Sequence, residues 1–374
     1  MNKHWASIWG NAVSIGENRP ESYGKDITLR YNIYVPFGGD KVRVTFDNYC
    51  GTDAINISRS SFFNGREFGT LTYDGMESVT IPAGESVVSD ELEISVEAGA
   101  DAYVSFYLGD FTQMRSAVYT SGPLSKGLFA TGDHTYDEDI SIMVSRKTNI
   151  NYFLSNVSVY TSKENKTIVC YGDSITAQDW PDYLNLRLKE EGYNNTVAIR
   201  RATSGSRILR EYECLTYASY GLKGDRRFSH EVPTDGADTV IIQQGINDII
   251  HPVGTDVNPF RPMSDLPTAD ELIDGLKYYI NLARSYNYKV YVGTLLPIKG
   301  WRTYAPFRDV LKDAYNDFIR TTDLIDGVVD FDKALRDPDA PAGFLPVYDS
   351  GDHLHPSALG YKRMAEEVPA SLFK

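Results

Sequence analysis

The feature that most constrains the fold is a change of pattern near the middle of the chain. From about Asp26 to Ser162 the sequence consists of short segments rich in β-branched and aromatic residues, such as ITLRYNIYVPF and AYVSFYLGDF. After the polar stretch 162–166, short apolar runs alternate with longer amphipathic ones. The chain has 374 residues, which is more than a single core usually fills. We therefore expect two domains, at residues 1–162 and 163–374.

The first half has the pattern of an antiparallel β-sandwich. Its apolar segments are separated by turn-forming groups of Gly, Pro and Asp, for example at 36–40, 82–84 and 99–101. None of the segments shows a long apolar period of 3.6 residues, so helices are not expected there. We predict a sandwich of the jelly-roll kind.

The second half has a β-α-β-α rhythm. Apolar runs such as TIVCY, DTVIIQQ and KVYVG alternate with amphipathic segments such as ADELIDGLKYYINLARSYN. Strands with continuous apolar stretches are buried on both faces. The second half is therefore predicted to be of the α/β class, with a parallel sheet covered by helices on each side.

Charge and hydropathy exclude several classes of partner. The chain has 37 Lys and Arg against 51 Asp and Glu, which gives a formal net charge of -14. Such a charge repels phosphate backbones and anionic lipid surfaces. No stretch approaches the roughly 20 apolar residues that cross a bilayer. We expect neither a nucleic acid nor a membrane as partner. The sequence gives no indication of the oligomeric state.

The cysteines favour a reducing compartment. Cys50, Cys170 and Cys214 are too few for a disulfide framework, and none belongs to a CxxC pair. The first 20 residues lack the apolar run and the small-residue cleavage site of a secretory signal. We expect a cytoplasmic protein, although a chain that had lost its leader would have the same pattern.

Four short polar segments follow apolar runs of the second half or lie near its end: 172–176, 201–206, 245–248 and 352–356. In an open α/β sheet, ligands bind beyond the carboxyl ends of the strands. These segments are therefore expected to form one site.

The residue types in these segments suit acyl transfer. A serine nucleophile needs a general base, and the base needs a group that fixes its tautomer. Ser174, His355 and Asp352 supply these three groups. Donors to a developing oxyanion are also present, namely the side-chain amide of Asn247 and the backbone N–H groups of Gly205 and Ser174.

The motifs Gly172-Asp173-Ser174, Gly205, Gly245-x-Asn247-Asp248 and Asp352-x-x-His355-Pro356 resemble those of the SGNH hydrolases, also called the GDSL esterase/lipase superfamily. The resemblance covers roughly 167–374. It implies a flavodoxin-like doubly wound sheet, a triad of Ser174, Asp352 and His355, an oxyanion hole of Ser174, Gly205 and Asn247, and no cofactor or metal ion. The segment YDSGDHLHPSALGY resembles a branch of two-domain bacterial esterases with an N-terminal β domain.

One departure from the lipase pattern bears on the acyl group. Thr176 stands where the second glycine of a GxSxG elbow would be. The resemblance implies a less strained turn and an open, shallow site, which suits short acyl groups.

Other residues near these motifs have simpler explanations. His353 and His355 could suggest a metal pair, but residues i and i+2 of an extended segment point to opposite sides, and no third ligand has matching spacing. We interpret Asp173 and Asp248 as structural residues. Trp180, Trp301 and Tyr304 could line a substrate cleft or could pack in the core.

The sequence thus predicts a serine esterase for short acyl groups, acetyl above all, on sugars or oligosaccharides. Its expected partner is a small acylated substrate. Three alternatives stay open: a general aryl or alkyl esterase, acyl transfer to another alcohol, and a carbohydrate-binding protein with an inactive hydrolase half.

Overall fold

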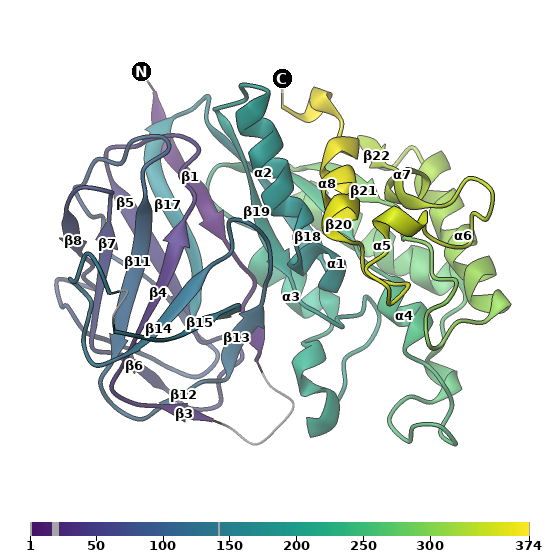
Figure 1. Cartoon of the computed structure of the whole chain (residues 1–374), viewed down its shortest axis with the longest axis horizontal. Coiled ribbons are helices and arrows are strands. Elements are labelled where there is room, and N and C mark those ends of the chain that lie inside the picture. The colour runs from purple at the N-terminus through teal and green to yellow at the C-terminus, as the bar shows by residue number, and fades with distance from the viewer. Residues whose placement is uncertain (1, 17–21, 141–142, 374) are drawn as a thin grey trace. The chain divides into compact units, whose positions relative to one another are not determined.

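The computed structural model describes residues 2–16, 22–140 and 143–373 (Figure 1). The chain divides into two compact units. The first comprises Met1–Thr167 with the short segments Leu188–Arg200 and Thr234–Ala237, and the second comprises Ile168–Arg187, Arg201–Pro233 and Asp238–Lys374. No helix among the described residues is both long and apolar enough to cross a membrane.

Two antiparallel sheets dominate the first unit. The four-stranded sheet has the order β1 (Lys3–Gly10), β17 (Leu154–Ser162), β5 (Val42–Asp47) and β10 (Ser86–Val88). The six-stranded sheet has the order β15 (Val144–Thr148), β14 (Gly127–Thr131), β4 (Ile27–Ile33), β11 (Ala102–Leu108), β7 (Arg59–Phe63) and β8 (Phe68–Thr70). Smaller sheets contain β2 (Ser14–Ile15), β13 (Ser116–Tyr119) and β16 (Ile150–Tyr152), then β3 (Tyr23–Gly24) with β12 (Thr112–Gln113), and β6 (Ile55–Ile57) with β9 (Val79–Ile81).

Aromatic side chains join the two large sheets of this unit. Phe46 of β5 and Phe106 of β11 are fully buried, and their ring centroids lie 4.9 Å apart. Phe153 packs edge-on against Phe106 in the same core. Side chains on β5 alternate between buried and partly exposed over most of its length, as expected for a strand with one face in a sandwich core. The predicted β-sandwich is confirmed.

The second half forms a five-stranded parallel sheet. Its order is β19 (Thr196–Ala202), β18 (Lys166–Gly172), β20 (Ala237–Gln243), β21 (Lys289–Gly293) and β22 (Gly327–Val329). Numbered along the chain from β18, this is the order 2-1-3-4-5 of flavodoxin-like folds. β19 is buried throughout and β18 and β20 nearly so, which explains their continuous apolar runs. The predicted doubly wound fold is confirmed.

The helices around this sheet fall into two groups by their mutual contacts. One group contains α3 (Gly224–Glu231), α4 (Ile246–Ile250), α5 (Ala269–Ser285) and α6 (Pro306–Thr321). The other contains α2 (Trp180–Glu190), α7 (Phe331–Leu335) and α8 (Ala358–Glu367), with the short α1 (Ser174–Ala177) preceding α2. Two such groups are what a sheet covered on both faces requires.

Short helical turns occupy the remaining connections, at η1 (Leu215–Tyr220), η2 (Met263–Asp265), η3 (Pro346–Tyr348) and η4 (Ala370–Leu372). The strand order reverses between β18 and β20. In open α/β sheets, ligands bind beyond the carboxyl ends of the strands at such a point. Ser174 follows β18 closely, and Asn247 follows β20. The fold therefore places two of the predicted site residues where a ligand is expected.

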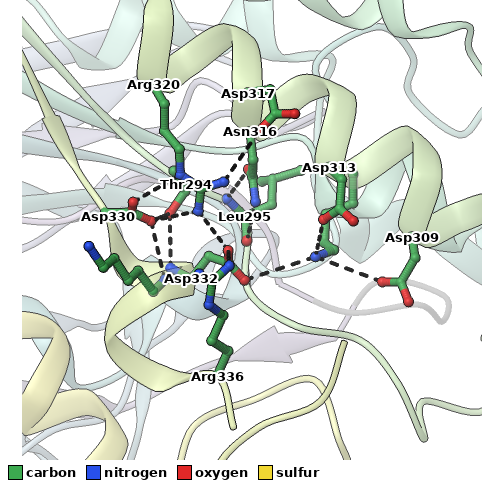
Figure 2. Close-up of polar contacts among 12 residues, drawn as sticks. Thr294, Leu295, Asp309, Asp313, Asn316, Asp317, Arg320, Asp330, Asp332 and Arg336 are labelled. Atoms are coloured by element: carbon green, nitrogen blue, oxygen red, sulfur yellow. Dashed lines mark hydrogen bonds and ion pairs between the residues drawn. The ribbon is translucent and has the colours of Figure 1, made fainter. Parts of the chain in front are cut away.

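A buried ionic cluster lies beyond β21 and β22 (Figure 2). Lys312 of α6 is 2% exposed and has carboxylates of Asp309, Asp313 and Asp332 within 4 Å. Arg320, about two helical turns further along α6, bonds Asp332 at 2.6 Å. The shared Asp332 ties α6 to the start of α7. Removing one partner of such a buried pair leaves an uncompensated charge, so the cluster holds these elements in one arrangement.

Candidate active site

Ser174 begins α1, directly after the carboxyl end of β18. The side chain of Asp173 caps this short helix, because its Oδ1 accepts a hydrogen bond from the N–H of Ile175 at 3.0 Å. Ser174 is 8% exposed. Its hydroxyl is thus held on a turn at the sheet edge rather than on a mobile loop.

The structure brings the predicted nucleophile, base and acid together. Ser174 Oγ lies 2.9 Å from His355 Nε2, although the two residues are 181 positions apart in sequence. On the other side of the ring, His355 Nδ1 lies 2.7 Å from Asp352 Oδ2. This is the arrangement in which a carboxylate orients an imidazole and the imidazole takes the hydroxyl proton.

The base stands on a loop, which we call the histidine loop (residues 349–356). Asp352 Oδ1 accepts the backbone N–H groups of Leu354 and His355 at 2.9 and 2.8 Å. Partial burial raises the pKa of Asp352, but the hydrogen bonds from His355 and these N–H groups lower it more. The net pKa is well below the ordinary value, so Asp352 stays ionised and can orient the ring at any pH near neutrality.

Gly205 is the second residue predicted to donate to an oxyanion. It has φ +80°, and its amide N–H makes no hydrogen bond among the described residues. A Cβ at this position would lie 2.2 Å from the ring of Tyr220. Both the backbone conformation and the close approach therefore require glycine here.

Asn247 is joined to the same loop. Its Nδ2 donates to the carbonyl of Ser206 at 3.1 Å, which fixes the amide and leaves its second N–H for another acceptor. Asn247 is buried at the start of α4. The structure thus places Asn247 beside the segment that carries Gly205.

An aromatic stack buttresses these two donors. The ring of Tyr220 lies against Gly205 on one side and stacks on His251, with centroids 4.9 Å apart and an interplanar angle of 27°. His251 ends α4, and its N–H bonds the carbonyl of Asn247 at 3.2 Å. Burial and then Arg261 and Arg207 lower the pKa of His251 well below its usual value, so this ring is neutral. The sequence analysis missed both residues, because nothing in their local pattern signals a contact with position 205.

Arg227 is a third residue that the sequence pattern did not reveal. It lies on α3, 2% exposed, and pairs with Glu231 at 2.8 Å. Its Nη1 donates to Ser206 Oγ at 2.8 Å and to the Gly172 carbonyl at 3.3 Å. Arg227 therefore links the turn at the nucleophile (the serine turn, residues 172–176) to the loop that carries Gly205 (the oxyanion loop, residues 203–206). The sequence of residues 203–237 is typical of loops because α3 is mostly polar. The feature that could have indicated a helix there is an Arg and a Glu four residues apart.

The two acidic residues interpreted as structural do hold backbone. Asp248 accepts the N–H groups of Ile208 and Leu209 at 2.8 and 3.0 Å. Burial raises the pKa of Asp173 to about 7 and that of Asp248 to about 6, in each case against hydrogen bonds that lower it. Both carboxyls are thus partly protonated near neutral pH, unlike Asp352.

His353 is directed to a partner of its own. Its Nδ1 lies 2.5 Å from Asp349 Oδ2, and the residue has φ +64°. Among the described residues, no group of three or more His, Cys, Asp or Glu side chains is placed to hold a metal ion.

The aromatic residues that could line a cleft have different surroundings. Trp180 is fully buried against Phe331, whereas Trp301 meets His355 edge-to-face, with ring centroids 6.4 Å apart.

This geometry is suited to nucleophilic attack on a carbonyl carbon. A hydroxyl, a base and an orienting carboxylate lie in hydrogen-bonding sequence, and Arg227 links the turn at the hydroxyl to Ser206, next to Gly205. All of these residues belong to the second unit.

Comparison with known proteins agrees with this chemistry. Residues 170–363, more than half of the chain, match the GDSL-like lipase/acylhydrolase family. No curated protein matches the chain. Solved structures that are similar include a GDSL-like lipase from Bacteroides thetaiotaomicron (19% identity, 57% of this chain and 90% of that chain, TM-score 0.37) and an acetyl xylan esterase (20%, 55% and 99%, TM-score 0.39). A third is a member of the lipolytic protein G-D-S-L family from Veillonella parvula (17%, 54% and 95%, TM-score 0.37).

The family match extends over the serine turn, the oxyanion loop and the histidine loop, so the resemblance seen in the sequence motifs is confirmed. The chain belongs to the GDSL-like lipase/acylhydrolase family and is an ester hydrolase.

Proposed function

We propose that this ester hydrolase is a serine esterase that removes short acyl groups, acetyl above all, from sugars or short oligosaccharides. The observation that carries the serine mechanism is the hydrogen-bonded series from Ser174 Oγ through His355 to Asp352, at 2.9 and 2.7 Å. A hydrogen-bonded hydroxyl and imidazole are more than a binding module needs, which favours an enzyme over an inactive hydrolase half.

The reaction has two halves. Ser174 Oγ attacks the ester carbonyl while His355 Nε2 takes its proton, and the N–H groups of Ser174 and Gly205 and the amide of Asn247 receive the oxyanion. His355 then gives the proton to the leaving alcohol as the C–O bond breaks, which leaves an acyl-enzyme. Water attacks the acyl-enzyme with His355 again as base, and the acid and free Ser174 are released.

The short acyl group is inferred from the turn at the nucleophile. Ser174 begins a four-residue helix instead of standing on a GxSxG elbow, and the resemblance associates this turn with a shallow site. The sugar moiety is inferred from the resemblance to two-domain bacterial esterases. None of the three cysteines, all of which lie in the described residues, forms a disulfide, which supports the cytoplasm as location and limits the substrate to small imported esters.

A fluorophosphonate probe and an ester panel test this proposal. We expect the probe to label the wild type on Ser174 and to leave Ser174→Ala unlabelled. The wild type should hydrolyse acetylated xylose or mannose oligomers and nitrophenyl acetate, with rates falling as the acyl chain lengthens. A wild type that is neither labelled nor active on any ester would favour the carbohydrate-binding alternative.

Two further readouts separate the remaining alternatives. Activity on nitrophenyl acetate without activity on acetylated sugars would indicate a general aryl or alkyl esterase. A transferred acetyl group on an added alcohol, detected by mass spectrometry in place of acetic acid, would indicate an acyltransferase.

A further inference from the structure

The loop between β21 and α6, residues 294–305, lies outside the motifs and contacts the ring of the base. We call it the Trp301 loop. Its Trp301 meets His355 edge-to-face, with ring centroids 6.4 Å apart and an interplanar angle of 84°. The predicted mechanism assigns no role to this residue.

The loop is fitted closely against the histidine loop. Gly300 has φ +103°, and a Cβ there would lie 2.6 Å from the ring of His353. Only a glycine allows this approach. The close approach of Gly300 to His353 therefore brings the Trp301 loop against the histidine loop, where Trp301 contacts His355.

The loop is also held firmly at both ends. At its start, the side chain of Asn316 accepts from the N–H of Leu295 at 2.8 Å and donates to its carbonyl at 2.9 Å (Figure 2). Thr294 donates to Asp330 at 3.1 Å, and Thr303 near the other end donates to the carbonyl of Ile250 at 2.9 Å. Trp301 is thus placed by fixed elements, as a specificity-determining side chain needs to be.

The indole presents carbon rather than nitrogen to its surroundings. Trp301 is partly exposed, but its Nε1 is buried and has no hydrogen-bond partner among the described residues. The exposed part of the ring system is therefore apolar. The guanidinium of Arg302 lies 4.6 Å from the ring centroid.

Polar groups lie next to this apolar surface. Arg302 is exposed and its guanidinium lies over the indole, and the exposed His353 lies beside Gly300. In a protein with a net charge of -14, this guanidinium offers N–H donors to a ligand. An apolar ring with donors beside it matches a sugar ring, which has a C–H face and a rim of hydroxyls.

The position relative to His355 decides which part of an ester would lie there. Gly205 and Asn247 belong to the oxyanion side, where the carbonyl oxygen goes, whereas His355 must face the leaving oxygen in order to protonate it. A ring packed on His355 is therefore beside the alcohol and not beside the acyl chain. We propose that Trp301, together with Arg302 beside it, forms the subsite for the sugar moiety of the leaving alcohol. This rests on the proposed function.

The test compares esters that share the acetyl group and differ in the alcohol. In Trp301→Ala, kcat/KM for acetylated sugars should fall roughly tenfold, while that for ethyl acetate changes less than about twofold. Trp301→Phe keeps a flat ring and should retain most of the activity on sugars. The ratio between acetyl and butyryl esters of one alcohol should be unchanged in both variants.

Controls separate this proposal from the mechanism itself. Phe307→Ala removes an exposed aromatic ring from the start of α6 and should leave the sugar to ethyl ratio unaltered. Fluorophosphonate labelling should keep its rate in Trp301→Ala, because the probe carries no sugar. If the probe did not label the wild type, the proposed function itself would be wrong.

Two results would overturn the subsite. One is a changed preference for acyl length in Trp301→Ala with an unchanged preference for the alcohol, which would place the indole in the acyl pocket. The other is a loss confined to nitrophenyl acetate with acetylated sugars unaffected, which would assign the surface to aryl alcohols.

Discussion

The two sides of the active site are built in different ways. The oxyanion side, with Gly205 and Asn247, is buried and is held by the Tyr220–His251 stack and a helix. The histidine loop is more open, with the Asp352 side chain 42% exposed, and is held by carboxylates that bond the loop's own backbone. The donors are thus part of the core, while the base depends on local loop contacts. Substitutions on the oxyanion side should change stability and activity together, and those on the histidine loop should change mainly activity.

The largest effect is expected from Asp352→Asn. The Oδ1 of the new asparagine can still accept the loop N–H groups, but its NH₂ group cannot accept the Nδ1–H of His355. The imidazole is then no longer held in the tautomer that leaves Nε2 free to act as base. We expect kcat to fall by about 10⁴-fold, with only a small decrease in the melting temperature because the Asp352 side chain is partly exposed. Asp349→Asn is the matched control, because Asp349 pairs with His353 in the same loop. Equal inactivation by both variants would contradict the assignment of Asp352.

Gly205→Ala should lower both activity and stability. Its Cβ would collide with Tyr220, and φ +80° costs an alanine about 1–2 kcal/mol. We expect kcat to fall about 10²-fold as the donor is displaced, with a lower free energy of unfolding in urea. Gly192→Ala, at φ +82° with open space around it, isolates the backbone strain. If the two variants were equally active, the donor role of Gly205 would be wrong.

The pH dependence of stability should separate the buried carboxyls from the exposed one. Asp173, with its pKa raised to about 7, contributes stability that is complete below pH 4 and declines as pH rises to 7. Asp352, with its pKa lowered, contributes stability above pH 4 that is lost below it. In Asp173→Asn, the decline between pH 4 and 7 should become shallower by at most about 1.4 kcal/mol per pH unit. Urea unfolding at several pH values measures this, and an unchanged slope would refute it.

The smallest effect concerns the stack. Tyr220→Phe loses only the hydrogen bond from Arg261 and should change kcat less than about twofold. Tyr220→Leu removes the ring beside Gly205, so kcat should fall roughly tenfold at constant KM. A change in KM instead of kcat would show that Tyr220 acts on substrate binding rather than on the donors.

Much of this architecture is readable in the chain because it depends on local pattern. The strands from β18 to β21 are buried and carry continuous apolar runs, and the residues after β18 and β20 carry recognisable motifs. Helix α3 was not predicted from the sequence because its buried face carries the charged residues Arg227 and Glu231. Their burial depends on carbonyl groups of other segments.

The supporting residues of the site could not be predicted for a related reason. Trp180 and Trp301 look equivalent in sequence, yet one packs in the core and the other on the base. Tyr220 meets Gly205 only through a turn of the chain between them. These are tertiary contacts, which no hydrophobic period or motif spacing encodes.

The edge-to-face contact between Trp301 and His355 has an optical consequence. A protonated imidazole quenches the fluorescence of an adjacent indole, whereas a neutral one does so far less. The emission of Trp301, isolated by replacing the other three tryptophans, should therefore report whether the base is charged. The protein carries its own indicator of catalytic readiness, which can be followed without any substrate or dye.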